Sequence, residues 1–156
     1  MLRVEIPGSG LLELEYLLLD YNGTLAEDGE LLPGVKERLD FLAGYLKIYV
    51  LTADTFGKAC AFCSRLPVKL LLVKGNGGYL EKEQAVKKLG PDKVVSIGNG
   101  YNDHLMLKAS WLGILVLGPE GAAVQSLLNA DVVTRNIEEA LDLLIHPQRL
   151  AATLRT

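Results

Sequence analysis

Three short polar segments, each directly after an apolar run, carry side chains that could act on a phosphate group. Asp20 follows the run YLLL, and Thr52 ends the run KIYVLT. Asn99 and Asp103 lie in GNGYND, which follows KVVSI. A carboxylate can attack phosphorus and form an aspartyl phosphate. A turn or cap role would explain Asp20 alone, but three such segments together favour a chemical site.

Phosphoryl transfer depends mainly on positioning and on neutralising negative charge, and Mg²⁺ can serve both needs. Magnesium prefers oxygen ligands in octahedral geometry and usually keeps several waters. We expect ligands from the Asp20 carboxylate, the backbone carbonyl of Asn22, and Asn99 or Asp103. The sequence therefore predicts Mg²⁺ as the cofactor.

The phosphate itself needs hydrogen-bond donors near the nucleophile. The Thr52 hydroxyl can donate to a phosphoryl oxygen, and its neighbour Ala53 is also expected to contact the phosphate. Gly23 and Thr24 follow the nucleophile in a glycine-bearing turn, where N–H groups can approach an anion closely. These residues form the predicted phosphate-binding set, together with a lysine.

A lysine is expected because one Mg²⁺ does not cancel the charge of the transferring group. Lys82, near the start of a helical segment, is the first choice, and Lys74 and Lys58 are rivals. For each of the three, a solvated surface charge is the plain alternative.

The elements that must position these residues alternate along the chain. Apolar runs LRVEI, LLELEYLLLD, KIYVLT, VKLLLV, KVVSI, LGILVL and DVV favour strands. Helical patterns cover PGVKERLDFLAGYL, DTFGKACAFCSRL, YLEKEQAVKKLG, NDHLMLKAS, GAAVQSLLNA, NIEEALDLLI and PQRLAATL. Several strands are continuously apolar, which indicates burial on both faces of a mostly parallel sheet. We expect one α/β domain over 1–156, a three-layer, doubly wound Rossmann-like fold with helices on both faces. Residues 1–15 should form a hairpin and 21–33 a short flap turn.

Composition limits the classes of function. The chain has 156 residues, 49% hydrophobic and 22% charged, with a net charge of −3. No basic field points to nucleic acid or an acidic membrane. The apolar runs are far shorter than the roughly 20 residues of a membrane span. With no signal-peptide core visible, a cytoplasmic location is expected.

The two cysteines, Cys60 and Cys63, form a single CxxC. A redox or zinc role would need a helix N-terminus or further ligands. We expect two small apolar residues on one buried helix face instead.

The motifs DYNGTLA, LTADT, the lysine of LEKEQAVKKLG and IGNGYNDHLML resemble, in order, the four motifs of the haloacid dehalogenase-like (HAD) superfamily. LTADT, GNGYND and GPEGAAVQSLLNADVV resemble the phosphorylation domain of P-type ATPases most. The chain looks like a small, soluble relative of that domain with no cap. The resemblance implies Asp20 as nucleophile, Thr52 and Lys82 as phosphate ligands, and Mg²⁺ near Asp20, the Asn22 carbonyl and the Asn99–Asp103 loop.

Two residues depart from the superfamily pattern. Phosphatases of the superfamily usually have a second Asp, as acid and base, where this chain has Asn22, and an amide cannot shuttle a proton. Asn99 replaces the first Asp of the usual GDGxND loop, which weakens the metal site or shifts ligation onto Asp103. His104 could replace the missing proton shuttle, although a cap or surface role is the better interpretation.

The resemblance also implies partners. An uncapped site fits a phosphorylated small molecule, or an exposed phosphate on a larger substrate, and a homo-oligomer could close it. The main hypothesis is a Mg²⁺-dependent phosphatase or phosphotransferase that is slow on ordinary esters because of Asn22. The alternatives are a phosphate- and Mg²⁺-binding regulatory module with weak or no catalysis, and a receiver-like signalling domain. The glycine and threonine of DYNGTLA argue against the receiver.

Overall fold

Within residues 1–53, 57–76 and 78–156, which the computed structural model describes, the chain forms a six-stranded sheet in which every pairing is parallel. The strands, in spatial order, are β10 (Val132–Thr134), β9 (Leu112–Val116), β8 (Val94–Gly98), β3 (Tyr16–Asp20), β6 (Lys47–Thr52) and β7 (Lys69–Leu72). When these six strands are numbered 1 to 6 along the chain, from β3 to β10, and read from β7 to β10, their order is the 3-2-1-4-5-6 of doubly wound folds. It differs from the 2-1-3-4-5 order of receiver-like domains, so that alternative was wrong.

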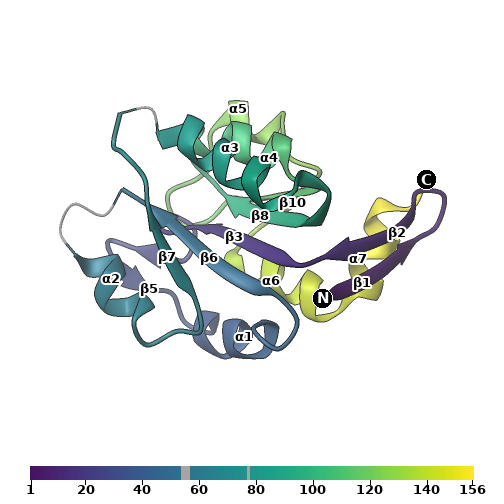
Figure 1. Cartoon of the computed structure of the whole chain (residues 1–156), viewed down its shortest axis with the longest axis horizontal. Helices are drawn as coiled ribbons and strands as arrows, with labels where there is room; N and C mark the ends of the chain where they lie inside the picture. Colours follow the sequence, from purple (N-terminus) through teal and green to yellow (C-terminus); the bar gives the residue numbers. More distant parts are fainter. Residues whose placement is uncertain (54–56, 77) are drawn as a thin grey trace.

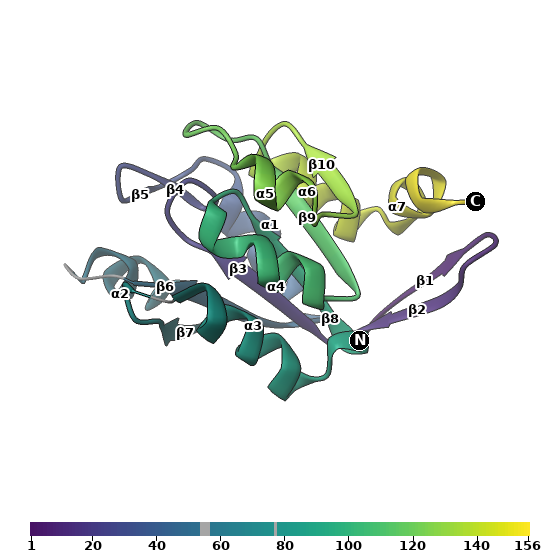
Figure 2. The same ribbon diagram turned by 90° about the horizontal axis from the view of Figure 1, so that it is seen from above.

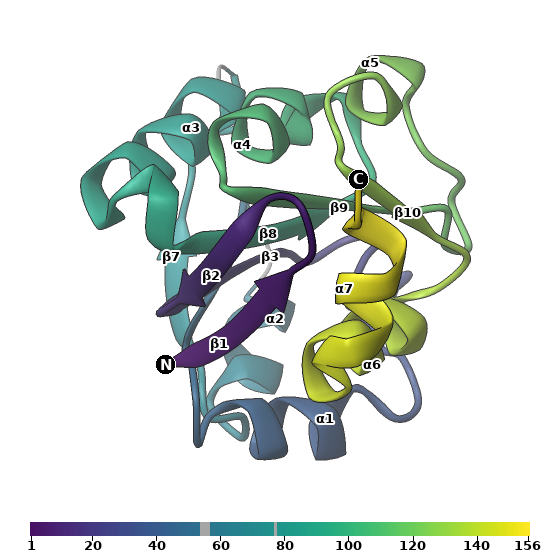
Figure 3. The same ribbon diagram turned by 90° about the vertical axis from the view of Figure 1, so that its right-hand side faces the viewer.

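Helices cover both faces of the sheet, as Figures 1 and 3 show. One face carries α1 (Val35–Leu42), α2 (Lys58–Cys63) and α6 (Ile137–Ile145), and the other carries α3 (Gly78–Leu89) and α4 (His104–Ala109). Strand β3 shows why: Leu17 and Leu19 join the core cluster of the first face, and Leu18 joins that of the second. Side chains alternate across a strand, so a continuously apolar run has to be covered twice. The expected three-layer α/β fold is confirmed.

The first and the last segments of the chain lie on the same side of the molecule, beyond the amino ends of the strands (Figure 2). Here β1 (Leu2–Ile6) and β2 (Gly10–Leu14) form an antiparallel hairpin, against which α7 (Pro147–Leu154) packs. The amide of Thr156 donates to the Pro7 carbonyl at 3.2 Å. Because β2 runs into the start of β3, the hairpin lies away from Asp20, at the opposite end of that strand.

Short elements border the carboxyl ends of the strands. A small flap of β4 (Ala26–Glu27) and β5 (Glu30–Leu31) follows β3. The 3₁₀ turn η2 (Tyr101–Asp103) follows β8, and α5 (Val124–Leu127) follows β9. A second 3₁₀ turn, η1 (Pro91–Lys93), leads into β8 at the other end of the sheet. In the described residues no helix is long and apolar enough to cross a bilayer.

The segment around the cysteines differs from the expectation. Its described helix, α2, begins at Lys58, so Cys60 lies in the first turn and not in mid-helix. The buried face is formed by Ala59 and Cys63, four residues apart, while Cys60 is exposed. The prediction of one buried face for both cysteines was therefore wrong for Cys60. Residues 54–56, part of LTADT and of the expected start of this helix, lie outside the described residues.

Candidate active site

Strands β6 and β7 lie on one side of β3, and the later strands β8, β9 and β10 lie on the other side. The direction of the chain across the sheet therefore switches between β3 and β8, which creates a crevice there. Ligands of doubly wound folds bind at this switch point, outside the carboxyl ends of the strands. A cavity of about 250 Å³ opens there. It is lined by Asp20, Asn22, Thr52, Ala53, Lys82, Asn99, Gly100, Asn102 and Glu120.

Asp20 is the last residue of β3, and its side chain lies at the floor of this cavity with 7% of the residue exposed. Its Oδ1 accepts from Lys82 Nζ at 2.6 Å, and its Oδ2 accepts from Thr24 Oγ1 at 3.2 Å. Burial, followed by the negative charge of Asp103, raises the pKa of Asp20 to about 6. The nearby ammonium group opposes this shift without cancelling it.

Lys82 reaches the site from the second turn of α3 and is 1% exposed. Its Nζ also donates to Asp103 Oδ1 at 2.7 Å, so one ammonium group joins two carboxylates. Burial lowers the pKa of Lys82, but the two carboxylates outweigh it and leave this pKa above its usual value. The rival lysines lie elsewhere. Lys58 packs beside Gly29 of the flap, and Lys74 borders a different hollow near the sheet edge.

Asp103 lies fully buried beneath the cavity and fixes the shape of the GNGYND loop. Its Oδ2 accepts from the amides of Asn99 and Gly100, each at 3.0 Å, while Oδ1 holds Lys82. Gly98 permits this approach, because a Cβ on it would lie 2.5 Å from Asp103 Cγ. Both Asp103 oxygens are thus engaged, so direct metal ligation by Asp103 would break these contacts. Its predicted ligand role stays a prediction.

Thr52 carries the clearest sign of a missing partner. It ends β6, is 3% exposed and lines the cavity beside Ala53. Among the described residues its buried Oγ1 has no hydrogen-bond partner. An unpaired buried hydroxyl is unfavourable, and such exceptions in folded proteins often mark ligand sites. A phosphoryl oxygen in the cavity would accept this hydrogen bond.

Two of the predicted metal ligands that line the cavity, Asn99 and Asn22, carry amide side chains. Asn99 is buried, accepts from Thr24 Oγ1 at 3.3 Å and donates through Nδ2 to the Gly121 carbonyl at 3.0 Å. Asn22 is exposed at the cavity mouth. No group of three or more His, Cys, Asp or Glu side chains in the described residues is arranged to hold a metal ion. One carboxylate with amide and carbonyl oxygens fits Mg²⁺, which binds few protein ligands and keeps its waters.

His104 does not face the nucleophile. It is buried, and its Nδ1 lies 2.6 Å from the Tyr101 carbonyl, to which it donates. Its ring lies against Tyr79 and Tyr101, with centroids 5.8 and 4.8 Å away. The cap interpretation thus describes His104 better than the proton-shuttle interpretation.

Glu120 was missed by the sequence interpretation. It lies on the loop after β9, which ends at the same edge of the sheet as β3, β6 and β8. The rule that polar residues after parallel strands share an edge would have found it. A larger hollow of about 490 Å³ lies between the edge strand β7 and α3, and it contains none of the strand-end polar residues.

No family model matches the chain. The uncharacterized protein MJ0073 of Methanocaldococcus jannaschii is 48% identical over 73 residues, which are 46% of this chain and 78% of the relative. The uncharacterized protein MJ0072 of the same organism is 56% identical over 39 residues, which are 25% of this chain and 89% of the relative.

The fold is shared with solved phosphatases and pumps. A protein described as a HAD family hydrolase from Streptomyces avermitilis superposes with a TM-score of 0.69 at 18% identity, with 87% of each chain covered. The 3-deoxy-D-manno-octulosonate 8-phosphate phosphatase of Moraxella catarrhalis, solved with magnesium and phosphate ions, gives 0.67 at 17% identity and covers 92% of this chain and 95% of its own. A zinc-transporting PIB-type ATPase in its E2.Pi state gives 0.62 at 26% identity, over 78% of this chain and 20% of the pump. The expected HAD resemblance is confirmed: the chain has the HAD fold without a cap in its described residues, and it belongs to the family of the uncharacterized protein MJ0073.

Proposed function

We propose that this protein transfers phosphoryl groups through Asp20, with a divalent cation, as a phosphohydrolase or phosphotransferase. The observation that carries the proposal is the unpartnered Thr52 hydroxyl in the same cavity as the Asp20 carboxylate. The Asp20 carboxylate, the Thr52 hydroxyl and the buried Lys82 ammonium group meet at the switch point of the sheet, in a fold shared with phosphatases.

In the proposed first step an Asp20 oxygen attacks phosphorus and the bond from phosphorus to the leaving-group oxygen breaks. The electron pair of that bond stays on the leaving oxygen, which takes a proton from solvent. Water then attacks the phosphorus of the aspartyl phosphate, which releases inorganic phosphate and restores the Asp20 carboxylate. Thr52 would donate to a phosphoryl oxygen. The amides of Gly23 and Thr24 already donate to the carbonyls of Ala26 and Tyr21, at 2.8 and 3.3 Å, so their part in phosphate binding stays a prediction.

The residues present fit Mg²⁺, and the Asp20 carboxylate, the Asn22 carbonyl and the Asn99 side-chain oxygen are the proposed ligands. The ion would supply charge neutralisation at the phosphoryl group. Lys82 adds a fixed positive charge, and Asp103 positions that lysine from below. Asp103 thus acts as a positioning residue in this scheme.

Asn22 sets the expected substrate preference. It lies exposed at the cavity mouth, where an acid would meet the leaving group, but an amide cannot donate its proton at neutral pH. Leaving groups of low pKa, such as acyl and aryl phosphates, depart without protonation. The proposed enzyme is therefore phosphorylated faster by these substrates than by alkyl phosphates, on which it is slow. The open cavity fits a phosphorylated small molecule or an exposed phosphate on a larger molecule, with no nucleic acid involved.

The test is phosphorylation of the protein itself. Incubation with Mg²⁺ and acetyl phosphate or p-nitrophenyl phosphate should release phosphate and place one phosphoryl group on Asp20, seen by intact-protein and peptide mass spectrometry. Asp20→Asn should abolish both signals. Asp92→Asn, at an exposed aspartate near the amino ends of the strands, is the matched control. No phosphate release and no label across the pH range would contradict the proposal.

A second candidate function is a regulatory module that binds phosphate and metal without turnover. The observation that favours it is the pair of amides, Asn22 and Asn99, at two positions of the cavity. Mg²⁺-dependent phosphate binding without a phosphoenzyme would support this function, and activity that appears only in Asn22→Asp would identify a disabled enzyme.

A further inference from the structure

The loop after β9 is attached to the candidate site by its backbone. The Ala123 amide donates to the Asn99 carbonyl at 2.8 Å, and the Asn99 side chain donates to the Gly121 carbonyl at 3.0 Å. Ser126 Oγ, just beyond the loop, donates to the Gly100 carbonyl at 2.5 Å. Residues 117–123 are therefore held against the GNGYND loop, and the position of Glu120 follows from that attachment.

The Glu120 carboxylate lies against the turn that carries the nucleophile. A Cβ on Gly23 would lie 2.5 Å from Glu120 Oε2 and 2.6 Å from Asn99 Nδ2, so the two side chains lie side by side over Gly23. The Gly23 backbone has φ +77°, a conformation that suits glycine. Gly118 of the same loop also lies close to this turn, because a Cβ on it would lie 2.8 Å from the Gly23 carbonyl oxygen. Glycine at 23 thus makes room for a carboxylate at the cavity.

The charges around the cavity leave Glu120 without compensation. Lys82 pairs with Asp20 and Asp103. Across the described part of the chain, the Glu120 carboxylate forms neither a hydrogen bond nor an ion pair, and it lines the cavity. Its neighbour Asn99 is neutral. Glu120 is exposed, so water solvates its charge, but a carboxylate at the edge of the cavity still attracts a cation and repels a bare anion.

We propose that Glu120 is a carboxylate of the divalent-cation site and supplies the negative charge that Asn99 lacks. This inference rests on the proposed function, since it concerns the same cavity. The unpartnered Thr52 hydroxyl is an independent sign that this cavity takes a ligand. The carboxylates are too dispersed to enclose a bare ion. Glu120 therefore acts on the ion through its bound waters, which Mg²⁺ retains readily.

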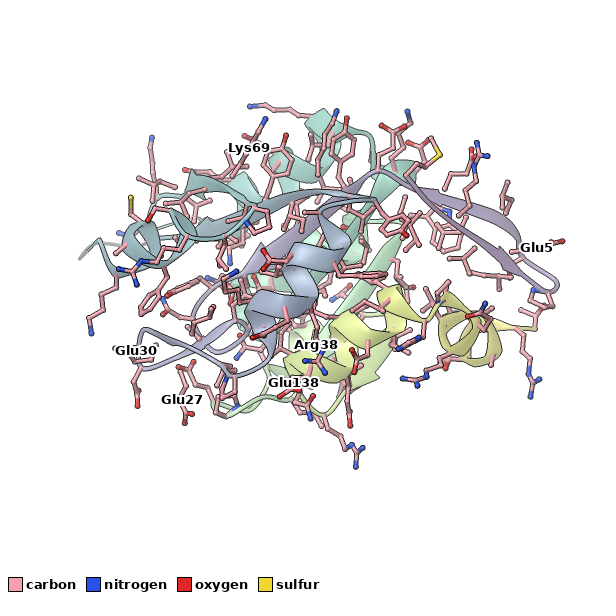
Figure 4. The ribbon with its side chains drawn as sticks, turned by 90° about the horizontal axis from the view of Figure 1, so that it is seen from below. Glu5, Glu27, Glu30, Arg38, Lys69 and Glu138 are labelled. Carbon is pink, nitrogen blue, oxygen red and sulfur yellow. The ribbon has the colours of Figure 1, made fainter. Side chains whose placement is uncertain are left out.

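The test is cation binding, measured apart from turnover. Isothermal titration with Mg²⁺, and the loss of the free Mn²⁺ paramagnetic resonance signal, give the affinity of the full chain. Glu120→Gln should weaken binding by roughly 10–100-fold, the usual effect of a lost carboxylate around a metal. Glu5→Gln, on the exposed N-terminal hairpin far from the cavity (Figure 4), should bind as the wild type does. The double variant Glu120→Gln with Asn99→Asp should regain affinity, because it returns the lost negative charge to a side chain that lies beside residue 120 over Gly23.

Three results would overturn the inference. Wild-type affinity in Glu120→Gln would do so, even if turnover fell, because a proton-transfer role would then explain the loss. Failure of Asn99→Asp to restore affinity would show that the charge is not what Glu120 supplies. Absence of cation binding in the wild type would overturn the metal part of the proposed function as well, whereas a phosphoenzyme formed by Glu120→Gln at high Mg²⁺ leaves that function standing. Circular dichroism of each variant separates misfolding from lost affinity.

Discussion

Lys82 Nζ lies 2.6 Å from Asp20 Oδ1 at the floor of a cavity, and both residues are buried. The two groups lie on elements 62 residues apart in sequence. Without the lysine, the carboxylates of Asp20 and Asp103 would share a buried space with no cation. The pair is therefore both a part of the site and a condition for folding around it.

Lys82→Met should destabilise the protein by about 3–5 kcal/mol, because removing one partner leaves buried charge without compensation. Urea denaturation at neutral pH measures the loss. Adding Asp20→Asn to Lys82→Met should recover part of it, since that change removes one of the two carboxylates. Lys87→Met, at an exposed pair with Glu83, should change the free energy of unfolding by less than about 1 kcal/mol. Equal losses at the two lysines would contradict this account.

Asn22→Asp should raise the rate of phosphoenzyme formation from alkyl phosphates by roughly 10²–10⁴-fold, because a carboxylic acid can protonate the leaving oxygen. Phosphoenzyme formation from acetyl phosphate, whose leaving group needs no proton, should gain little. Rapid-quench measurement of phosphoenzyme formation from both substrates checks the difference apart from the later hydrolysis of the aspartyl phosphate. Asn129→Asp, near the end of α5, adds the same charge outside the cavity and should leave both rates unchanged. A uniform gain on both substrates would point to altered metal binding instead of proton transfer.

Thr52→Val should leave stability unchanged or slightly higher, because the hydroxyl it removes is buried and unpartnered among the described residues. Inhibition by orthophosphate should weaken about tenfold, since one hydrogen bond to a charged group is lost. Thr134→Val is the matched control. Its hydroxyl donates to carbonyls of Leu115 and Asn136, so that variant should lose about 1 kcal/mol of stability and keep its phosphate affinity. A stability loss at Thr52 equal to that at Thr134 would argue that Oγ1 has a partner.

Asp142→Asn should destabilise the protein by about 1–2 kcal/mol at pH 7 by breaking the contact between α6 and α1. Arg38 Nε donates to Asp142 at 2.8 Å, and Arg38 also pairs with Glu138 (Figure 4). The hydrogen bond from Arg38 holds the pKa of Asp142 below its ordinary value of 3.8. A lowered pKa contributes stability above the unfolded value, and this contribution is lost as the pH falls through the folded value.

The difference between wild type and Asp142→Asn should therefore be constant from neutral pH down to about 4 and shrink below that. Urea denaturation across this range measures it. Asp40→Asn, at an exposed pair with Lys36, should stay within about 0.5 kcal/mol throughout. A difference that grows on acidification would contradict the role of the Arg38 contact.

The arrangement of Asp20, Thr52 and Asn99 around one cavity could be predicted from sequence because it follows from a general rule. Each residue ends or follows an apolar strand, and parallel strands of one sheet share their carboxyl edge. Lys82 is different: three lysines were open, and only the packing of α3 on the sheet decides which one reaches Asp20.

Glu120 and Cys60 show what the pattern of residues does not contain. The strand-end rule places Glu120 at the right edge of the sheet, but its position over Gly23 depends on hydrogen bonds between its loop and Asn99 that no sequence pattern contains. The exposure of Cys60 depends on which face of α2 packs on the core: that face holds Ala59 and Cys63, and a rotation of the helix by one residue, about 100°, would change which cysteine is covered.

The central place of β3 in the sheet has a consequence for the newly made polypeptide. Strand β3 pairs with β8, whose residues 94–97 are synthesised much later than β3 itself. Until β8 is made, Leu17, Leu18 and Leu19 of β3 lack one of their two neighbouring strands. Asp103, which holds Lys82 beside Asp20, has also not yet been made. Strand pairings between residues this distant in sequence form slowly. Nascent chains of intermediate length therefore expose an aggregation-prone apolar strand that chaperones would bind. Completion of the reactive centre is thereby tied to completion of the sheet.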